Sequence, residues 1–167
     1  MIDDIATCVT MDAKSSGNKL VLVGETKSEM GGSHLLMIEP SSSCNMQLPT
    51  VSLVDGPLNA RAVHKAIRAG LVTSAHDCSE GGVLLAVAEM AFGGELGVEL
   101  QLDDESLCFS ETPSRYILEV QQDKLNQLQQ LLGDIHYEVI GTFNESNNVT
   151  LGESTWAIED LRQAWTE

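Results

Sequence analysis

The sequence predicts an α+β fold, a layered structure in which a mixed β-sheet has helices packed on its faces. Runs rich in apolar and β-branched residues alternate along the chain with segments whose apolar residues recur at helical spacing. Two pairs of the strand-like runs are joined by short polar turns, as in antiparallel hairpins. No Gly-x-Gly-x-x-Gly turn follows the first run, which argues against a purely parallel dinucleotide-binding sheet.

The N-terminal part predicts three strands and a loop. The runs "IATCVTMDA" (5–13) and "KLVLVGE" (19–25) are separated by "KSSGN", whose composition is typical of a turn, so we expect them to pair. "HLLMIE" (34–39) predicts a further strand. The polar, proline-containing residues 40–57 have no period and predict a loop.

Two helices are predicted in the first half, with a short buried strand, "LVTSA" (71–75), between them. The first begins at Asn59 and ends before Gly70, and its predicted buried face comprises Ala60, Val63, Ala66 and Ile67. The second runs from near Gly81 to about Phe92 and ends at two glycines. Because it is apolar nearly all round, we expect it to be covered on more than one side.

The second half predicts four strands and two helices. Strands are expected over 96–102 and 114–121, and 137–143 should form a final hairpin with 148–152. The segment 123–133 has helical spacing of Leu125, Leu128 and Leu132, with Asp123 in its first turn. A closing helix over 157–167 has Ile158, Leu161 and Trp165 on one stripe.

Length and charge limit the classes of function. A chain of 167 residues with 43% hydrophobic content predicts one domain over 1–167. A net charge of -16 argues against a nucleic-acid partner. No apolar run approaches the ~20 residues of a membrane span, and the N-terminus lacks the pattern of a signal peptide. Cys8, Cys44, Cys78 and Cys108 have no zinc-site spacing and are expected to be free thiols. We therefore expect a soluble, cytoplasmic protein without a membrane partner.

The stretch "TSAHDCSEGG" (73–82) allows two interpretations. Ser79 or Asp77 could accept hydrogen bonds from the first N–H groups of the following helix and act only as its cap. Alternatively, the helix start could hold an anionic group, with His76 as a donor and Asp77 as a ligand of a metal or a hydroxyl.

Two other stretches are candidate binding loops. In "VGETKSEMGGS", residues Gly31, Gly32 and Ser33 would let the backbone approach a ligand closely, although the order and ending of a P-loop are missing. In "FSETPSRY", Glu111 and Thr112 precede Pro113, which favours an extended or turn geometry that could direct both side chains outwards.

The stretches "VTMDAKSSGNKLVLVGETKSEMGGS", "AIRAGLVTSAHDCSEGGVLLAVAEMAFGGELGVEL", "CFSETPSRYILEV" and "LRQAWTE" resemble the final domain of phosphoribosylformylglycinamidine synthase. The resemblance implies a fold like the C-terminal domain of aminoimidazole ribonucleotide synthase, and a chain that is one domain of a larger multidomain enzyme. That enzyme uses ATP and Mg²⁺ to activate the amide oxygen of formylglycinamide ribonucleotide, and ammonia from a glutaminase then displaces the phosphate.

The resemblance also suggests site residues. In the equivalent domain of the enzyme's first half, the position of Asp77 is associated with magnesium and that of Glu111-Thr112-Pro113 with substrate. Thr112 replaces the usual Ser and keeps the hydroxyl; Cys78 replaces Val or Leu. Since the second-half site is regarded as degenerate or structural, we expect no catalytic residue here. The binding candidates are Gly31, Gly32, Ser33, His76, Glu111 and Thr112, with Asp77 for metal.

Three roles remain open at this point. The domain could help form an auxiliary nucleotide or phosphate pocket, could be a purely structural module, or could be a free-standing ligand-binding or regulatory domain of the same superfamily. The expected partners are the remaining synthase domains, a glutaminase subunit and a small accessory subunit. The isolated chain is expected to be inactive, to hold no tightly bound cofactor and to self-associate.

Overall fold

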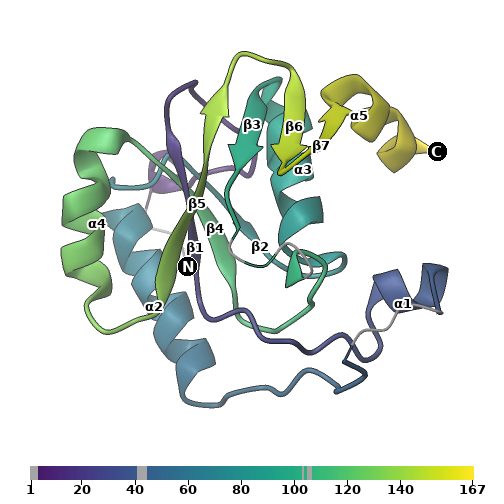
Figure 1. The fold of residues 1–167 in the computed structure, drawn as a ribbon. Helices are drawn as coiled ribbons and strands as arrows, with labels where there is room; N and C mark the ends of the chain where they lie inside the picture. Colours follow the sequence, from purple (N-terminus) through teal and green to yellow (C-terminus); the bar gives the residue numbers. More distant parts are fainter. Residues whose placement is uncertain (1–3, 41–44, 103, 105–106) are drawn as a thin grey trace.

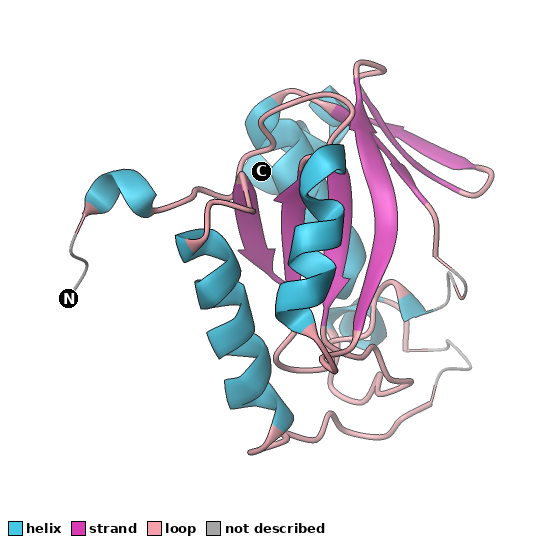
Figure 2. Ribbon diagram, turned by 90° about the vertical axis from the view of Figure 1, so that its left-hand side faces the viewer, coloured by secondary structure: helices cyan, strands magenta, loops and turns pink. Residues whose placement is uncertain are grey.

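The computed structural model describes residues 4–40, 45–102, 104 and 107–167. Its centre is one sheet of seven strands in the order β2-β4-β1-β5-β3-β6-β7, and helices pack on both faces (Figure 1, Figure 2). β3 and β6 are parallel, and the other neighbouring pairs are antiparallel. The predicted α+β class with a mixed, layered sheet is confirmed.

The strands are β1 (Lys19–Val23), β2 (Ser74–Asp77), β3 (Gly97–Leu100), β4 (Tyr116–Val120), β5 (Tyr137–Asn144), β6 (Asn148–Leu151) and β7 (Ser154–Ala157). The helices are α1 (His34–Ile38), α2 (Asp55–Arg68), α3 (Gly82–Gly94), α4 (Leu125–Leu132) and α5 (Ile158–Thr166). Short 3-10 turns lie at Ile5–Thr7 and Gln122–Lys124. Within the described residues, no helix is both long and apolar enough to cross a bilayer.

The central strand β1 separates two apolar layers. Leu20 and Leu22 belong to the cluster that contains α3, whereas Val21 and Val23 belong to the cluster that contains α2 and α4. Both faces of the strand are buried from Leu20 to Val23, which agrees with a run, "LVLV", that is apolar without alternation. At about 25 cal/mol per Å² of apolar surface, burial on both faces makes this strand a main contributor to stability.

The helix α3 is covered on two sides, as its composition predicts. One side packs on the sheet in the apolar layer, and α5 packs against another. There the Trp165 and Phe92 rings lie 5.7 Å apart, and Arg162 donates to the Phe92 carbonyl at 2.7 Å. The predicted face of α2 is correct for Val63 and Ala66, which are buried, but Ala60 is exposed.

The predicted strand over 5–13, and its pairing with 19–25, are wrong. Both edges of β1 are already occupied by β4 and β5, which leaves no edge for a hairpin partner. The segment instead makes single backbone hydrogen bonds to β2 and α3: the Thr10 carbonyl accepts from Ala75 N at 3.1 Å, and Ala13 N donates to the Met90 carbonyl at 3.0 Å. In the turn that follows the segment, the buried Glu119 carboxylate accepts hydrogen bonds from Lys14 N, Ser15 N and Asn18 Nδ2.

The predicted strand over 34–39 is also wrong, because these residues form α1. The Ser33 side chain accepts a hydrogen bond from Leu36 N, which starts the helix. Only Leu36 is buried in this helix, and Met37 and Ile38 are exposed. A short apolar run does not by itself distinguish a strand from a helix.

The predicted hairpin of 137–143 with 148–152 is wrong in its pairing, although both strands exist. β3 lies between them, so β6 pairs with β3 and forms a hairpin with β7 instead. The connection from β5 to β6 crosses the start of β3 at Gly97. A Cβ atom there would lie 2.9 Å from the backbone nitrogen of Asn147 and 2.4 Å from the side-chain oxygens of Asn144 and Ser146, so a larger residue would force the connection to shift.

Candidate functional site

Three segments that are distant in sequence converge: the glycine-containing loop before α1, the β2–α3 connection and the loop before β4. Glu111 joins all three. Its Oε1 atom accepts hydrogen bonds from Gly81 N at 2.9 Å and from His34 N at 2.9 Å, and it lies 3.3 Å from His34 Nδ1. Burial raises the pKa of Glu111, but these backbone N–H groups and the His34 ring together outweigh it and hold the pKa below its ordinary value.

The predicted cap of α3 by Ser79 or Asp77 is wrong. The Ser79 hydroxyl donates to the Asp77 carboxylate at 2.5 Å, so neither side chain accepts from the helix. The helix begins after Gly81, which has φ +74° and no side-chain cap. The acceptors at its start are Glu111, the Ser79 carbonyl and the Cys108 carbonyl.

His76 and Asp77 are the last two residues of β2 rather than part of a pre-helix loop. The Asp77 carboxylate is 61% exposed, and the hydrogen bond from Ser79 lowers its pKa. The His76 ring lies between two acceptors, with Nε2 2.7 Å from Glu89 Oε2 and Nδ1 2.7 Å from the Asp77 carbonyl. Glu89 in turn accepts from Trp165 Nε1 at 3.0 Å, so His76 connects β2 to α3 and α5.

The glycine-containing loop is used within the fold. Gly31 N donates to the Gln47 carbonyl at 2.9 Å, and a Cβ at Gly31 would lie 2.3 Å from the Met46 carbonyl oxygen. Gly32 has φ +77°, and Ser33 caps α1. The close approach that these residues permit is therefore to the chain's own backbone over 46–47.

Thr112 and a residue that the sequence did not indicate, Arg115, hold the loop before β4. The Thr112 hydroxyl lies 3.1 Å from Lys27 N and 3.2 Å from the Lys27 carbonyl. The Arg115 side chain, only 1% exposed, donates to the Thr112 carbonyl at 2.8 Å, to Thr26 Oγ1 at 2.9 Å and to the Ser110 carbonyl. Burial lowers the pKa of Arg115. The only local signal for this role is a charged residue at the start of an apolar strand.

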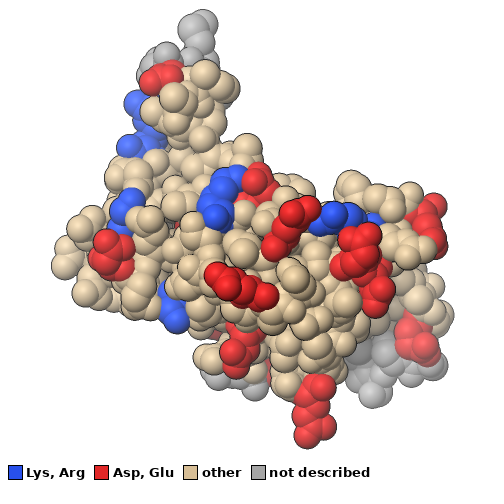
Figure 3. All heavy atoms as spheres, turned by 90° about the horizontal axis from the view of Figure 1, so that it is seen from above, with Lys and Arg blue, Asp and Glu red and all other residues tan. Residues whose placement is uncertain are grey.

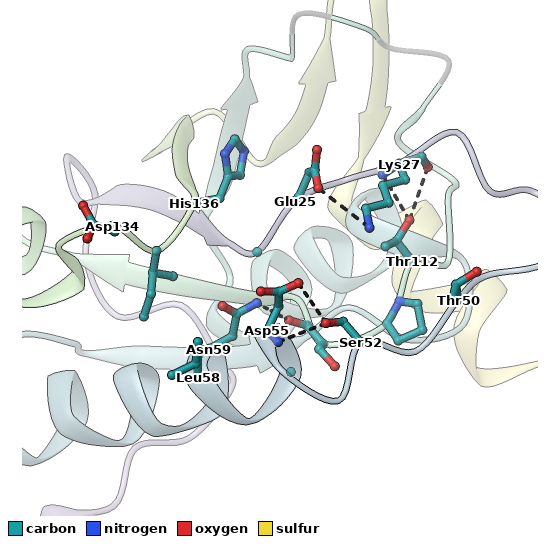
Figure 4. A pocket seen from close by; sticks show the side chains of 15 residues that line it. Glu25, Lys27, Thr50, Ser52, Asp55, Leu58, Asn59, Thr112, Asp134 and His136 are labelled. Carbon is teal, nitrogen blue, oxygen red and sulfur yellow. Dashed lines mark hydrogen bonds and ion pairs between the residues drawn. The ribbon is translucent and has the colours of Figure 1, made fainter.

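The loop at Pro113 and Ser114 separates two cavities. One, of about 400 Å³, is lined by Asp77, Ser79, Glu80 and Glu111 as well as by Cys78, Arg115 and Tyr116. The other, of about 300 Å³, includes Thr112 and lies at the start of α2 (Figure 4). The structure thus brings Asp77 and Glu111 into one cavity and places Thr112 beside the other. Among the residues described, no group of three or more His, Cys, Asp or Glu side chains could hold a metal ion.

Of the four cysteines, Cys44 lies outside the described residues. Cys8, Cys78 and Cys108 are not in disulfides, and Cys78 and Cys108 are buried. Burial raises the pKa of the Cys78 thiol to about 12. Although Cys78 follows Asp77 directly, it is a packing residue.

Comparison with known proteins identifies the family to which this chain belongs. Residues 15–153 match the family model described as AIR synthase related protein, C-terminal domain. Three similar solved structures come from Thermotoga maritima: PurL complexed with FGAR (17% identity, TM-score 0.79), phosphoribosylformylglycinamidine synthase II (18%, 0.76) and PurLQS (18%, 0.74). Each match covers 94% of this chain, and it covers 30%, 28% and 28% of those chains respectively.

At this identity the structural matches show a common fold, and the present chain spans less than a third of each of the three T. maritima chains. The family model covers most of the chain, from the residues before β1 to the turn after β6. The chain belongs to the family of AIR synthase related protein C-terminal domains.

Proposed function

We propose that this chain is the C-terminal domain of a phosphoribosylformylglycinamidine synthase and that its role there is structural or auxiliary rather than catalytic. The family match, the fold shared with PurL and the order of the resembling motifs support the assignment. The whole enzyme would convert formylglycinamide ribonucleotide, ammonia and ATP to the amidine, ADP and phosphate. Its remaining domains, a glutaminase subunit and a small accessory subunit would be the partners.

One observation carries the structural role: the polar groups of the candidate site bond to the chain itself. Glu111 accepts from two backbone N–H groups, Thr112 contacts the Lys27 backbone, and the Arg115 guanidinium donates to three oxygens. A phosphate site needs donors directed at the ligand. Among the described residues that line the larger cavity, Arg115 is the one cation and directs its donors into the fold, and the cavity carries three carboxylates.

ATP and Mg²⁺ belong to the complete enzyme in this proposal. Mg²⁺ is usually held by one or two carboxylates together with substrate phosphates. Asp77 offers one exposed carboxylate, which already accepts the Ser79 hydroxyl, and Glu111 is occupied by backbone donors. This donor set does not fit a magnesium ion held by the chain alone, so no step is assigned to the metal here. A cytoplasmic location is proposed because the described cysteines form no disulfides, as in a reducing compartment.

The experiment measures ADP release and amidine formation from formylglycinamide ribonucleotide, ATP and an ammonium salt. The chain is assayed alone, and then together with the remaining domains of the synthase supplied as a separate polypeptide. We expect no turnover from the chain alone and restored turnover from the combination. A double variant, Asp77→Asn with Glu80→Gln, should also restore turnover if the role is structural.

Substrate-dependent ADP release by the chain alone, above a heat-denatured control, would contradict the proposed role. Failure of the combination to recover activity, despite a stable complex in sedimentation, would contradict the synthase assignment. Loss of turnover in the double variant without loss of complex formation would favour an auxiliary ligand site over a purely structural role.

A further inference from the structure

The cavity at the start of α2 is acidic, and the synthase assignment does not use it. Its lining includes three carboxylates, Glu25, Asp55 and Asp134, and one lysine, Lys27. The Lys27 ammonium lies 3.8 Å from the Glu25 carboxylate, so its charge is offset within the chain. Figure 4 shows Asp55 beside Ser52 and Asn59, with Glu25 and Lys27 above it and Asp134 to its left. With two further carboxylates beyond that ion pair, the cavity favours a cation over a phosphate.

The cavity also has an apolar wall. Leu58, Pro113 and Ile135 line it together with polar groups. A long side chain with an aliphatic stem and a charged end fits such a mixed lining, since the stem contacts apolar atoms while the end reaches the carboxylates. Arginine and lysine have this form, and arginine can also bond a carboxylate in a bidentate manner.

An apolar ridge lies beside the acidic cavity. It consists of Val51, Leu53, Val54 and Leu58, whose exposed fractions are 62%, 86%, 68% and 47%. The residues between them in sequence, Ser52 and Asp55, line the cavity. Adjacent exposed apolar residues of this kind mark surfaces that other molecules cover.

The charge around the ridge selects among the molecules that could cover it. Asp55 lies within the ridge segment, Glu25 and Asp134 line the adjoining cavity, and the nearest cations in sequence are Lys27, which is paired with Glu25, and Arg61. A second copy of the chain would bring the same acidic surface and a net charge of -16, so like charges would meet at the edge of the contact. A segment that is apolar and basic complements both features.

We propose that this surface binds a segment of another polypeptide in which apolar residues flank an arginine or lysine. The apolar residues pack on the ridge, and the basic side chain enters the acidic cavity towards Asp55 and Asp134. The inference goes beyond the proposed function, because it concerns the chemistry of a partner segment and uses no feature of the synthase reaction.

The experiment uses two dye-labelled synthetic peptides, acetyl-Leu-Leu-Arg-Leu-Ser-amide and the same peptide with citrulline in place of arginine. Citrulline keeps the shape of arginine and removes the charge. Binding to the full chain is measured by fluorescence polarisation at low and high salt, and the contact surface is identified from backbone amide NMR shifts. We expect the arginine peptide to bind about tenfold more tightly at low salt, with the difference shrinking in 0.5 M NaCl as charges are screened.

Variants separate the two parts of the surface. Asp55→Asn and Asp134→Asn should each lower the affinity for the arginine peptide roughly two- to fivefold, as expected for partly exposed charge pairs, and leave the affinity for the citrulline peptide unchanged. Leu53→Ser should lower the affinity for both peptides by the same factor. Glu153→Gln, which removes an exposed acid from the β6–β7 turn, is the matched control and should change neither.

Equal affinity for the two peptides, no binding at millimolar concentration, or amide shifts outside residues 50–59 and 133–136 would each overturn the proposal. So would ridge variants that abolish self-association of the chain while the arginine peptide fails to compete, because a second copy would then be the occupant. Since the probe is a peptide and not a synthase substrate, any of these results would leave the proposed function standing.

Discussion

Replacing Glu111 tests the role of the one carboxylate that joins three loops. Its side chain is 17% exposed and accepts from two backbone N–H groups at 2.9 Å each. Hydrogen bonds to a charged group contribute roughly 1.5–3 kcal/mol each. Taking the lower end because the site is partly open, we expect Glu111→Ala to lower the free energy of unfolding by about 3 kcal/mol. Glu111→Gln, which keeps a neutral acceptor, should cost about half as much, and Glu80→Gln, an exposed neighbour, should cost under about 0.5 kcal/mol.

The effect should depend on pH in a defined direction. The pKa of Glu111 is lower in the folded protein than its ordinary value of about 4.3. The charged carboxylate therefore contributes its full stability above about pH 4.3, and this contribution is lost as the pH falls through the lower folded-state pKa. Urea unfolding at pH 7, 5 and 3.5 should show the difference between wild type and Glu111→Gln shrinking only at the lowest pH. A difference that is constant with pH, or a cost of Glu111→Ala below about 0.5 kcal/mol, would refute this role.

Four further outcomes follow from the same structure. Ser79→Ala should lower the free energy of unfolding in urea by under about 0.5 kcal/mol, since Ser79 does not cap α3, and should raise the pKa of Asp77 in an NMR titration. A loss near 1 kcal/mol would instead support Ser79 as the cap of α3. Arg115→Lys should cost about 2–4 kcal/mol because one ammonium cannot reproduce three donors in a plane, and a neutral result would contradict the loop role. N-ethylmaleimide at pH 8 should label Cys8 but not Cys78 until the chain unfolds, as peptide mapping would reveal; labelling of folded Cys78 would contradict its burial. The isolated chain should self-associate in sedimentation at micromolar concentration, more strongly at high salt because its acidic surface (Figure 3) is then screened, and a monomer under all conditions would contradict this.

The sequence predicted which segments form helices and strands better than it predicted which strands lie side by side in the sheet. Helical spacing indicated α2, α3, α4 and α5, and apolar runs indicated β1, β3 and β4, because these signals are local. The sequence could not predict that β3 separates β5 from β6. The connection from β5 to β6 passes close to Gly97, the first residue of β3, but a glycine inside a strand pattern is equally typical of a bulge, so it does not indicate such a connection.

The candidate site shows the same limit. The family resemblance made Asp77 and Glu111 candidate site residues, and both line one cavity. The partners of Glu111, however, are backbone N–H groups 30 and 77 residues away in sequence. Backbone donors are present at every position except proline, so residue types cannot identify which of them a carboxylate will meet.

The position of β6 beside β3 also bears on how the edge of the sheet is protected. Val98 pairs with Val149, with fifty residues between them in sequence, and β6 covers the edge of β3 that faces away from β5. Without β6, β3 would be an open edge whose apolar Val98 and Leu100 could pair with another chain. A ribosome-bound or truncated chain ending near Asn144 would expose this edge, so the final residues protect the domain from aggregation.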